Sequence, residues 1–78
     1  MKLIRLQKEI TVDFLNGSTA KEIADKYELP LSHVDATIRL VCAELLNMVR
    51  TNISVKQIMD TKQFLLRRLT ISHDYIAI

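Results

Sequence analysis

The stretch from Thr19 to Val41, TAKEIADKYELPLSHVDATIRLV, decides the fold of this 78-residue chain. Its first part carries apolar residues at i, i+3, i+4 and i+7, the spacing of one helix face turned toward a core. These residues are Ala20, Ile23, Ala24 and Tyr27. Thr19 and Glu22 have the spacing of a capping box, in which each side chain accepts a hydrogen bond from the backbone N–H of the other. The stretch therefore predicts a short amphipathic helix that begins at Thr19.

The turn that follows is Glu28-Leu29-Pro30. Proline ends the first helix, because the residue before it is pushed out of the helical region and proline has no N–H to donate. A second helix is predicted just beyond, with Ser32 as its N-cap and its end near Arg50. Its apolar face repeats at Val34, Ile38, Val41 and Leu45. The sequence thus predicts two helices joined by a tight turn.

The pattern T-x-K-E-I-A, followed by L-P and then V-x-x-x-I, resembles the helix-turn-helix of bacterial and phage DNA-binding proteins. Upstream, LQKEITVDFLNG (6–17) is similar to the scaffold helix and Asn-Gly stop of the four-helix variety, found in response-regulator output domains and the promoter-reading domain of sigma factors. The resemblance implies that the helix after Pro30 is a recognition helix. Many members have glycine in the turn where this chain has Glu28. The implied DNA-binding residues are Thr19, Lys21, Lys26, Ser32, His33, Ala36, Thr37 and Arg39.

Composition agrees with packed helices. The chain is 49% apolar and has one Gly and one Pro, which argues against a disordered chain or a turn-rich β protein. We predict an all-α fold, a small bundle of about four helices, with a helix-turn-helix domain at 1–69 and a short extended C-terminal tail at 70–78. The formal net charge of +2 is a mild basic bias, compatible with DNA but without a polycationic arm.

Two further helices and the tail complete the prediction. One helix is expected from Lys2 to Leu15, with Gly17 in the left-handed conformation of a helix C-terminus. The other follows the polar break at 51–54. The β-branched and aromatic residues of the tail favour an extended segment. An isolated strand leaves its backbone unsatisfied, so the tail must pack on the helices, pair with a second subunit, or add to a partner's sheet.

Apolar residues outside the predicted core indicate a homodimer or a protein partner. The residues expected at this contact are Leu40, Ala43, Phe64, Tyr75, Ile76 and Ile78. Two functions remain open: a small transcription regulator that binds double-stranded DNA as a homodimer, or a helix-turn-helix scaffold of a phage or mobile element that binds host transcription machinery. Lys21, Lys26, Arg39 and the basic face of Lys56, Arg67 and Arg68 favour DNA. Asp35 and Glu44 favour the protein partner, because phosphates repel carboxylates.

The sequence shows no arrangement of residues typical of catalysis, metal binding or membrane insertion. His33 and His73 lie forty positions apart with the single Cys42 between them, which is not the spacing of a zinc site. One glycine cannot form a phosphate-binding loop, and no nucleophile–base pair stands out. We therefore expect no enzyme activity, no cofactor and no metal. The lone cysteine permits no internal disulfide and the apolar runs are too short for a membrane span, so we expect a cytoplasmic protein with no membrane partner.

Overall fold

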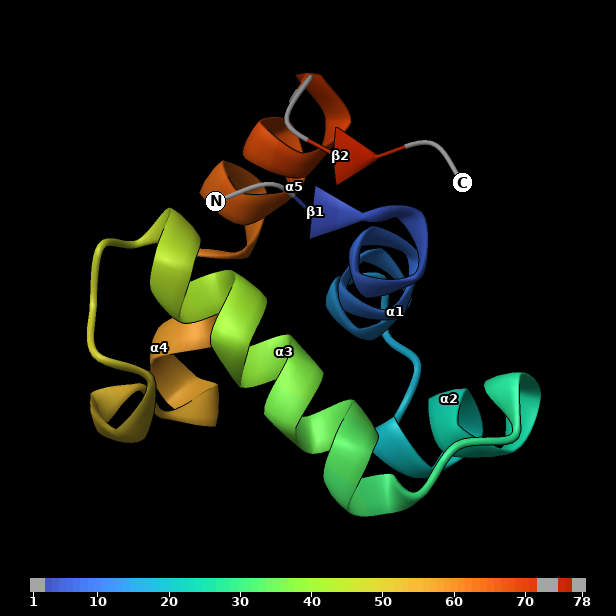
Figure 1. The fold of residues 1–78 in the computed structure, drawn as a ribbon. Coiled ribbons are helices and arrows are strands. Elements are labelled where there is room, and N and C mark those ends of the chain that lie inside the picture. The colour runs from blue at the N-terminus through green and yellow to red at the C-terminus, as the bar shows by residue number, and fades with distance from the viewer. Residues whose placement is uncertain (1–2, 72–74, 77–78) are drawn as a thin grey trace.

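The computed structural model describes residues 3–71 and 75–76, and it confirms the predicted all-α class. Five α-helices are present in these residues: α1 (Arg5–Leu15), α2 (Ala20–Tyr27), α3 (Leu31–Leu45), α4 (Val55–Asp60) and α5 (Lys62–Ile71). A 3-10 turn, η1 (Arg50–Asn52), lies between α3 and α4. Figure 1 shows α3 crossing the molecule, with α1 and α5 packed on one side of it.

The core lies where α1, α3 and α5 meet, and it extends under α2 and α4. Its buried apolar residues are Ile10, Leu15, Ile23, Ala24, Val34, Ile38, Val41, Cys42, Ala43, Ile53, Ile58, Leu65 and Leu69. The predicted stripes of α2 and α3 supply its centre, because Val34 and Val41 are fully buried and Ile23 nearly so. Burial of apolar area of this kind is the main favourable term in folding.

Three successive helices end in the same way. The chain takes a positive φ at Gly17 (+111°), Glu28 (+56°) and Asn47 (+56°). Glu28 directly follows α2, whereas Gly17 and Asn47 lie two residues beyond the ends of α1 and α3. In each case the next residue donates its N–H to the carbonyl five residues back along the chain, from Ser18 to Asp13 (3.0 Å), Leu29 to Ala24 (2.9 Å) and Met48 to Ala43 (2.8 Å). These are the bonds of the Schellman motif, which satisfies carbonyl groups that a helix end leaves free. The predicted left-handed cap at Gly17 is confirmed.

Helix boundaries differ from the prediction at three places. α1 begins at Arg5 rather than Lys2, and α3 ends at Leu45 rather than near Arg50 because Asn47 turns the chain into the left-handed region. Val49 lies beyond the end of α3 and is 63% exposed. Ser32 is not the N-cap, since α3 begins at Leu31 with Pro30 in the cap position. The left-handed turn at Glu28 already reverses the chain, so α3 starts directly after Pro30.

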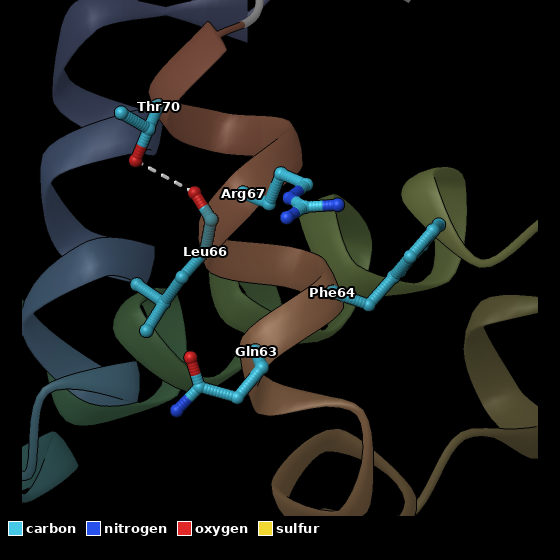
Figure 2. A pocket seen from close by; sticks show the side chains of 5 residues that line it. All are labelled: Gln63, Phe64, Leu66, Arg67 and Thr70. Atoms are coloured by element: carbon cyan, nitrogen blue, oxygen red, sulfur yellow. Dashed lines mark hydrogen bonds between the residues drawn. The ribbon is translucent and has the colours of Figure 1, made fainter.

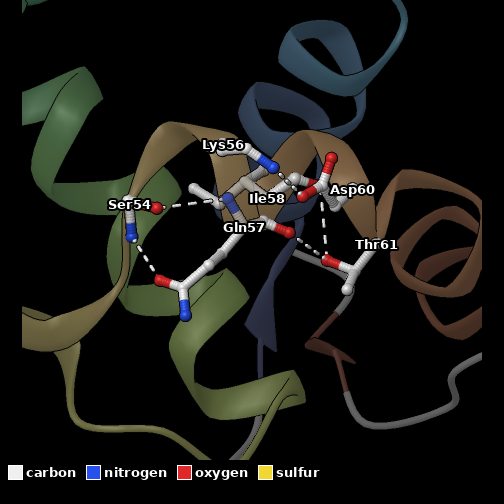
Figure 3. Close-up of polar contacts among 6 residues, drawn as sticks. All are labelled: Ser54, Lys56, Gln57, Ile58, Asp60 and Thr61. Atoms are coloured by element: carbon white, nitrogen blue, oxygen red, sulfur yellow. Dashed lines mark hydrogen bonds and ion pairs between the residues drawn. The ribbon is translucent and has the colours of Figure 1, made fainter.

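The single helix predicted after the polar break is two helices. Thr61 separates α4 from α5, and its hydroxyl donates to the carbonyls of Gln57 (2.7 Å) and Ile58 (3.3 Å) (Figure 3). Such bonding of Thr to the preceding helical turn bends or interrupts helices. A capping box between Ser54 and Gln57 begins α4. The interruption lets α4 and α5 each bury an apolar side against the same core.

The C-terminal segment is partly helical and partly a strand. α5 continues through Thr70 and Ile71, where an extended tail was predicted. Strand β2 (Tyr75–Ile76) then pairs in parallel with strand β1 (Leu3–Ile4), so this backbone finds a partner inside its own chain. That is a different arrangement from the three predicted for the tail. Ile78, the remaining residue of the predicted contact segment, lies outside the described residues.

Candidate nucleic-acid interface

The turn between α2 and α3 is built by Glu28. Its left-handed backbone lets Glu28 donate to the carbonyl of Asp25 (3.4 Å) and Leu29 donate to that of Ala24. Glycine adopts this conformation without a steric penalty, which explains why many helix-turn-helix proteins have glycine here. Leu29 is half-buried against the core. The chain therefore forms a left-handed turn here without a glycine.

Thr19 begins α2 with the predicted capping box. The Thr19 hydroxyl accepts from the Glu22 N–H (3.1 Å), and the Glu22 carboxylate accepts from the Thr19 N–H (2.8 Å). The backbone hydrogen bond from Thr19 holds the pKa of Glu22 below its ordinary value. Both side chains are exposed, so Thr19 orders the start of α2 at the surface.

The N-terminal half of α3 presents a small, mainly uncharged surface. Ser32, His33 and Ala36 are exposed, as the recognition-helix prediction requires. Thr37 is only 7% exposed, which makes it a core-side residue rather than a surface one. At about 100° per residue Thr37 lies about 40° from Val41, at the edge of the buried face. The surface available to a ligand is therefore narrower than predicted.

Arg39 is held by two acceptors. Its Nε donates to the Asp35 carboxylate (3.1 Å), and its terminal nitrogen donates to the backbone carbonyl of Ile53 (2.7 Å). The guanidinium thus joins α3 to the segment that leads into α4. One predicted DNA contact is consequently neutralised by a carboxylate on the same helix face.

Lys26 is also paired. Its Nζ lies 2.9 Å from the Asp13 carboxylate of α1, which also accepts from the Tyr27 hydroxyl at 2.9 Å. The hydrogen bond to Asp13 raises the pKa of Lys26, and burial is the main cause that raises the pKa of Tyr27. Lys21 is exposed and makes no ion pair within the described part of the chain. Asp13 therefore ties α2 to α1, and Lys21 is the lysine of α2 available to a phosphate.

A small groove of about 260 Å³ runs beside the exposed side of α3. Its lining comes from α1, α3 and the start of η1: Ile4, Leu6, Gln7, Ile10, His33, Ala36, Thr37, Leu40 and Arg50. Arg50 is an exposed cation that the sequence placed at the end of a long helix and away from the site. The early end of α3 brings it into one groove with His33 and Ala36. No sequence pattern gave its position, because that depends on the path of the loop.

The predicted contact residues do not form one surface. Leu40 is half-buried and lines the groove beside α3, whereas Phe64 is 49% exposed on α5 and lines a different one. Ala43 is 2% exposed, which corrects its placement on the outer face. The chain leaves α3 three residues later and folds back, so that Met48 donates to the Ala43 carbonyl. For Tyr75 and Ile76 the structure describes the strand pairing with β1.

Comparisons with known proteins gave no significant match among protein-family models, curated proteins or solved structures. Within residues 3–71 and 75–76, no helix combines the length and the apolar character needed to cross a bilayer.

Proposed function

We propose that this protein is a small sequence-specific transcription regulator that binds duplex DNA through α3. The observation that carries the proposal is the left-handed turn at Glu28, followed by an α3 whose first two turns expose Ser32, His33 and Ala36. Helices of this kind enter the major groove with their N-terminal residues toward the base edges. Small side chains there allow a close approach of the helix to DNA. α1 and the rest of the core support α3 from behind.

Phosphate contacts are few in this arrangement. Lys21 is available, Arg50 lies on the groove beside α3, and no side chain caps the N-terminus of α3 in the structure. A free helix N-terminus attracts anions through its unpaired N–H groups. Each neutralised phosphate contributes about −0.9 to the slope of the logarithm of the binding constant against the logarithm of the salt concentration. We therefore expect a slope of about −2 to −3 per subunit.

Asp35 gives a direct test of the role of α3. Asp35→Asn removes a carboxylate from the proposed DNA face and releases Arg39 from its ion pair. We expect DNA affinity to rise about 3- to 10-fold in fluorescence anisotropy at low salt, with a steeper salt slope. If Asp35→Asn weakens binding to a selected site, Asp35 instead accepts from a cytosine amino group, and the neutralisation argument fails.

Asp60→Asn is the matched control. It removes the same charge and releases Lys56 from an (i, i+4) pair of 2.8 Å, but on α4 instead of α3 (Figure 3). An effect equal to that of Asp35→Asn would show a general response to net charge. A smaller effect supports α3 as the contact surface.

A second candidate function is a helix-turn-helix scaffold that binds a protein partner, such as host transcription machinery. The observation that favours it is the pairing of Lys26 and Arg39 with Asp13 and Asp35, which lowers the charge available to DNA. Absence of DNA binding at low salt, together with a folded wild-type chain, would select this function over the first.

A homodimer is part of the DNA-binding proposal, because two subunits place two reading helices at successive major grooves about 34–36 Å apart. Leu40, half-buried beside the exposed face of α3, is the described residue of α3 proposed for the contact. Light scattering at micromolar concentration is expected to give twice the monomer mass, and a monomer on DNA as well as free would refute the dimer.

A further inference from the structure

α5 carries an exposed aromatic residue beside two arginines. Phe64 is 49% exposed, and Arg67 and Arg68 follow it at i+3 and i+4 on the outer side of the helix. The Arg68 guanidinium lies 5.9 Å from the centre of the Phe64 ring. Figure 2 shows Phe64 and Arg67 leaving α5 on the same side. The ring is thus an apolar centre with a cationic rim.

An open groove of about 590 Å³ lies along this side of α5. It is lined by Gln63, Phe64, Leu66, Arg67 and Thr70 (Figure 2). The ring of Phe64 and the aliphatic chain of Leu66 give the groove apolar area, and Arg67 gives it charge. A ligand that fits this groove must supply both apolar anchors and negative charge.

The charge of α5 is uncompensated along its own length. Its sequence, KQFLLRRLTI, holds three basic residues and no carboxylate. On the neighbouring α4, by contrast, Lys56 is paired with Asp60. α5 therefore presents a positive field to a partner, and complementary charge raises the rate and the specificity of association.

We infer that the α5 face, defined as Gln63, Phe64, Arg67 and Arg68, docks an acidic amphipathic helix of a second protein. The partner helix lays apolar residues against Phe64 and places its carboxylates on the two arginines. A second copy of this chain fits poorly, because a two-fold contact at this face brings the arginines of the two copies together. Duplex DNA satisfies the arginines but leaves the exposed ring without an apolar partner.

The α5 face is separate from the proposed DNA surface. In Figure 1, α5 lies at the top of the molecule and the turn between α2 and α3 at the bottom. Both surfaces can therefore be occupied in one molecule. The docking inference does not depend on DNA binding, and its test uses no DNA-binding readout.

The test is a selection from a displayed library of random helical peptides on the full-length protein, with depletion on the Phe64→Ala variant. We expect enriched sequences rich in Asp and Glu, with apolar residues at i, i+3 or i+4, and i+7. A synthetic peptide of the most enriched sequence is then titrated by anisotropy. Phe64→Ala is expected to weaken its binding by about tenfold or more, as truncation of an interface anchor does. The double variant Arg67→Gln, Arg68→Gln is expected to weaken it and to flatten its salt dependence.

Met59→Ala is the matched control, because Met59 is also an exposed large apolar residue (39%) but lies on α4. The Met59→Ala variant is expected to bind the selected peptide with the same affinity as the wild-type protein. Circular dichroism checks that every variant is folded. The inference would be overturned if no peptide were enriched, if the enriched peptides were basic or uncharged, or if Met59→Ala lost as much peptide affinity as Phe64→Ala. The inference would also be overturned if the protein bound single-stranded DNA more tightly than the peptide and lost that binding in Phe64→Ala. Phe64 would then be a ring on which bases stack.

Discussion

Glu28 tests whether the turn has the conformation on which the proposal rests. A non-glycine residue in the left-handed region carries a steric penalty of about 1–2 kcal/mol. The Glu28 side chain is exposed and makes no hydrogen bond or ion pair within the described residues, so its removal sacrifices no contact. Glycine removes the penalty but loses about 0.5–1 kcal/mol through the greater entropy of the unfolded chain. Glu28→Gly is therefore expected to stabilise the protein by about 0.5–1 kcal/mol.

Urea unfolding followed by circular dichroism measures this change, and thermal unfolding gives a second readout. For a domain of this size, each kcal/mol raises the midpoint by about 4–8 °C. The matched control is Asn47→Gly, since Asn47 has the same φ of +56° at the end of α3. Asparagine visits the left-handed region more readily than glutamate, so the gain there is expected to be smaller.

The result that would refute the reasoning is a loss of stability in Glu28→Gly with an unchanged denaturant slope. It would mean that residue 28 is not left-handed in solution and that α2 and α3 are joined differently. A gain in Asn47→Gly equal to that in Glu28→Gly would show that the identity of the residue does not matter.

Two further predictions concern single side chains. Tyr27→Phe removes the hydroxyl that donates to Asp13 and is expected to lower the free energy of unfolding by about 0.5 kcal/mol, measured with urea; an unchanged value would show that this bond between α1 and α2 adds no stability. Burial raises the pKa of the Cys42 thiol to about 12 from its ordinary 9.0, so the folded protein is expected to react with a disulfide reagent at about pH 8 only as fast as it opens. At a pH between these two pKa values only the unfolded chain carries the thiolate, so the free energy of unfolding falls as the pH rises above 9.0. Fast labelling of Cys42 in the native protein would contradict the burial of this thiol.

The two helices α2 and α3 were predictable because their determinants are local. The capping box of Thr19, the apolar stripe of α2 and the proline after Leu29 all act within a few residues, and the structure has each of them. The left-handed conformation of Glu28 was harder to predict from the sequence, because glutamate has no preference for it. Leu29, which packs against the core, and Pro30, the N-cap of α3, directly follow Glu28.

The errors lie where long-range contacts or weak local preferences decide. The end of α3 was predicted near Arg50 although the sequence holds a local signal for an earlier end. Asn47 followed by the apolar Met48 is the pattern of a Schellman motif, which places the end of α3 near Leu45. The break at Thr61 had no comparable pattern. The (i, i+4) spacing of Asp35 and Arg39 is a local signal for their ion pair, whereas the bond from Arg39 to the Ile53 carbonyl depends on the path of the loop. The pairing of β1 with β2 joins the two ends of the chain and has no local determinant.

The most direct test of DNA binding through α3 is a paired measurement on wild type and Ala36→Glu. Duplexes selected by the wild-type protein from a random-sequence pool are titrated by anisotropy at low salt, with Met59→Glu as an equally charged control on α4. Ala36 is exposed, so glutamate there keeps the fold and places a carboxylate against the base edges. We predict an enriched motif that wild type and Met59→Glu bind and that Ala36→Glu does not. No enriched motif, or binding by Ala36→Glu equal to that of Met59→Glu, would contradict DNA recognition by α3.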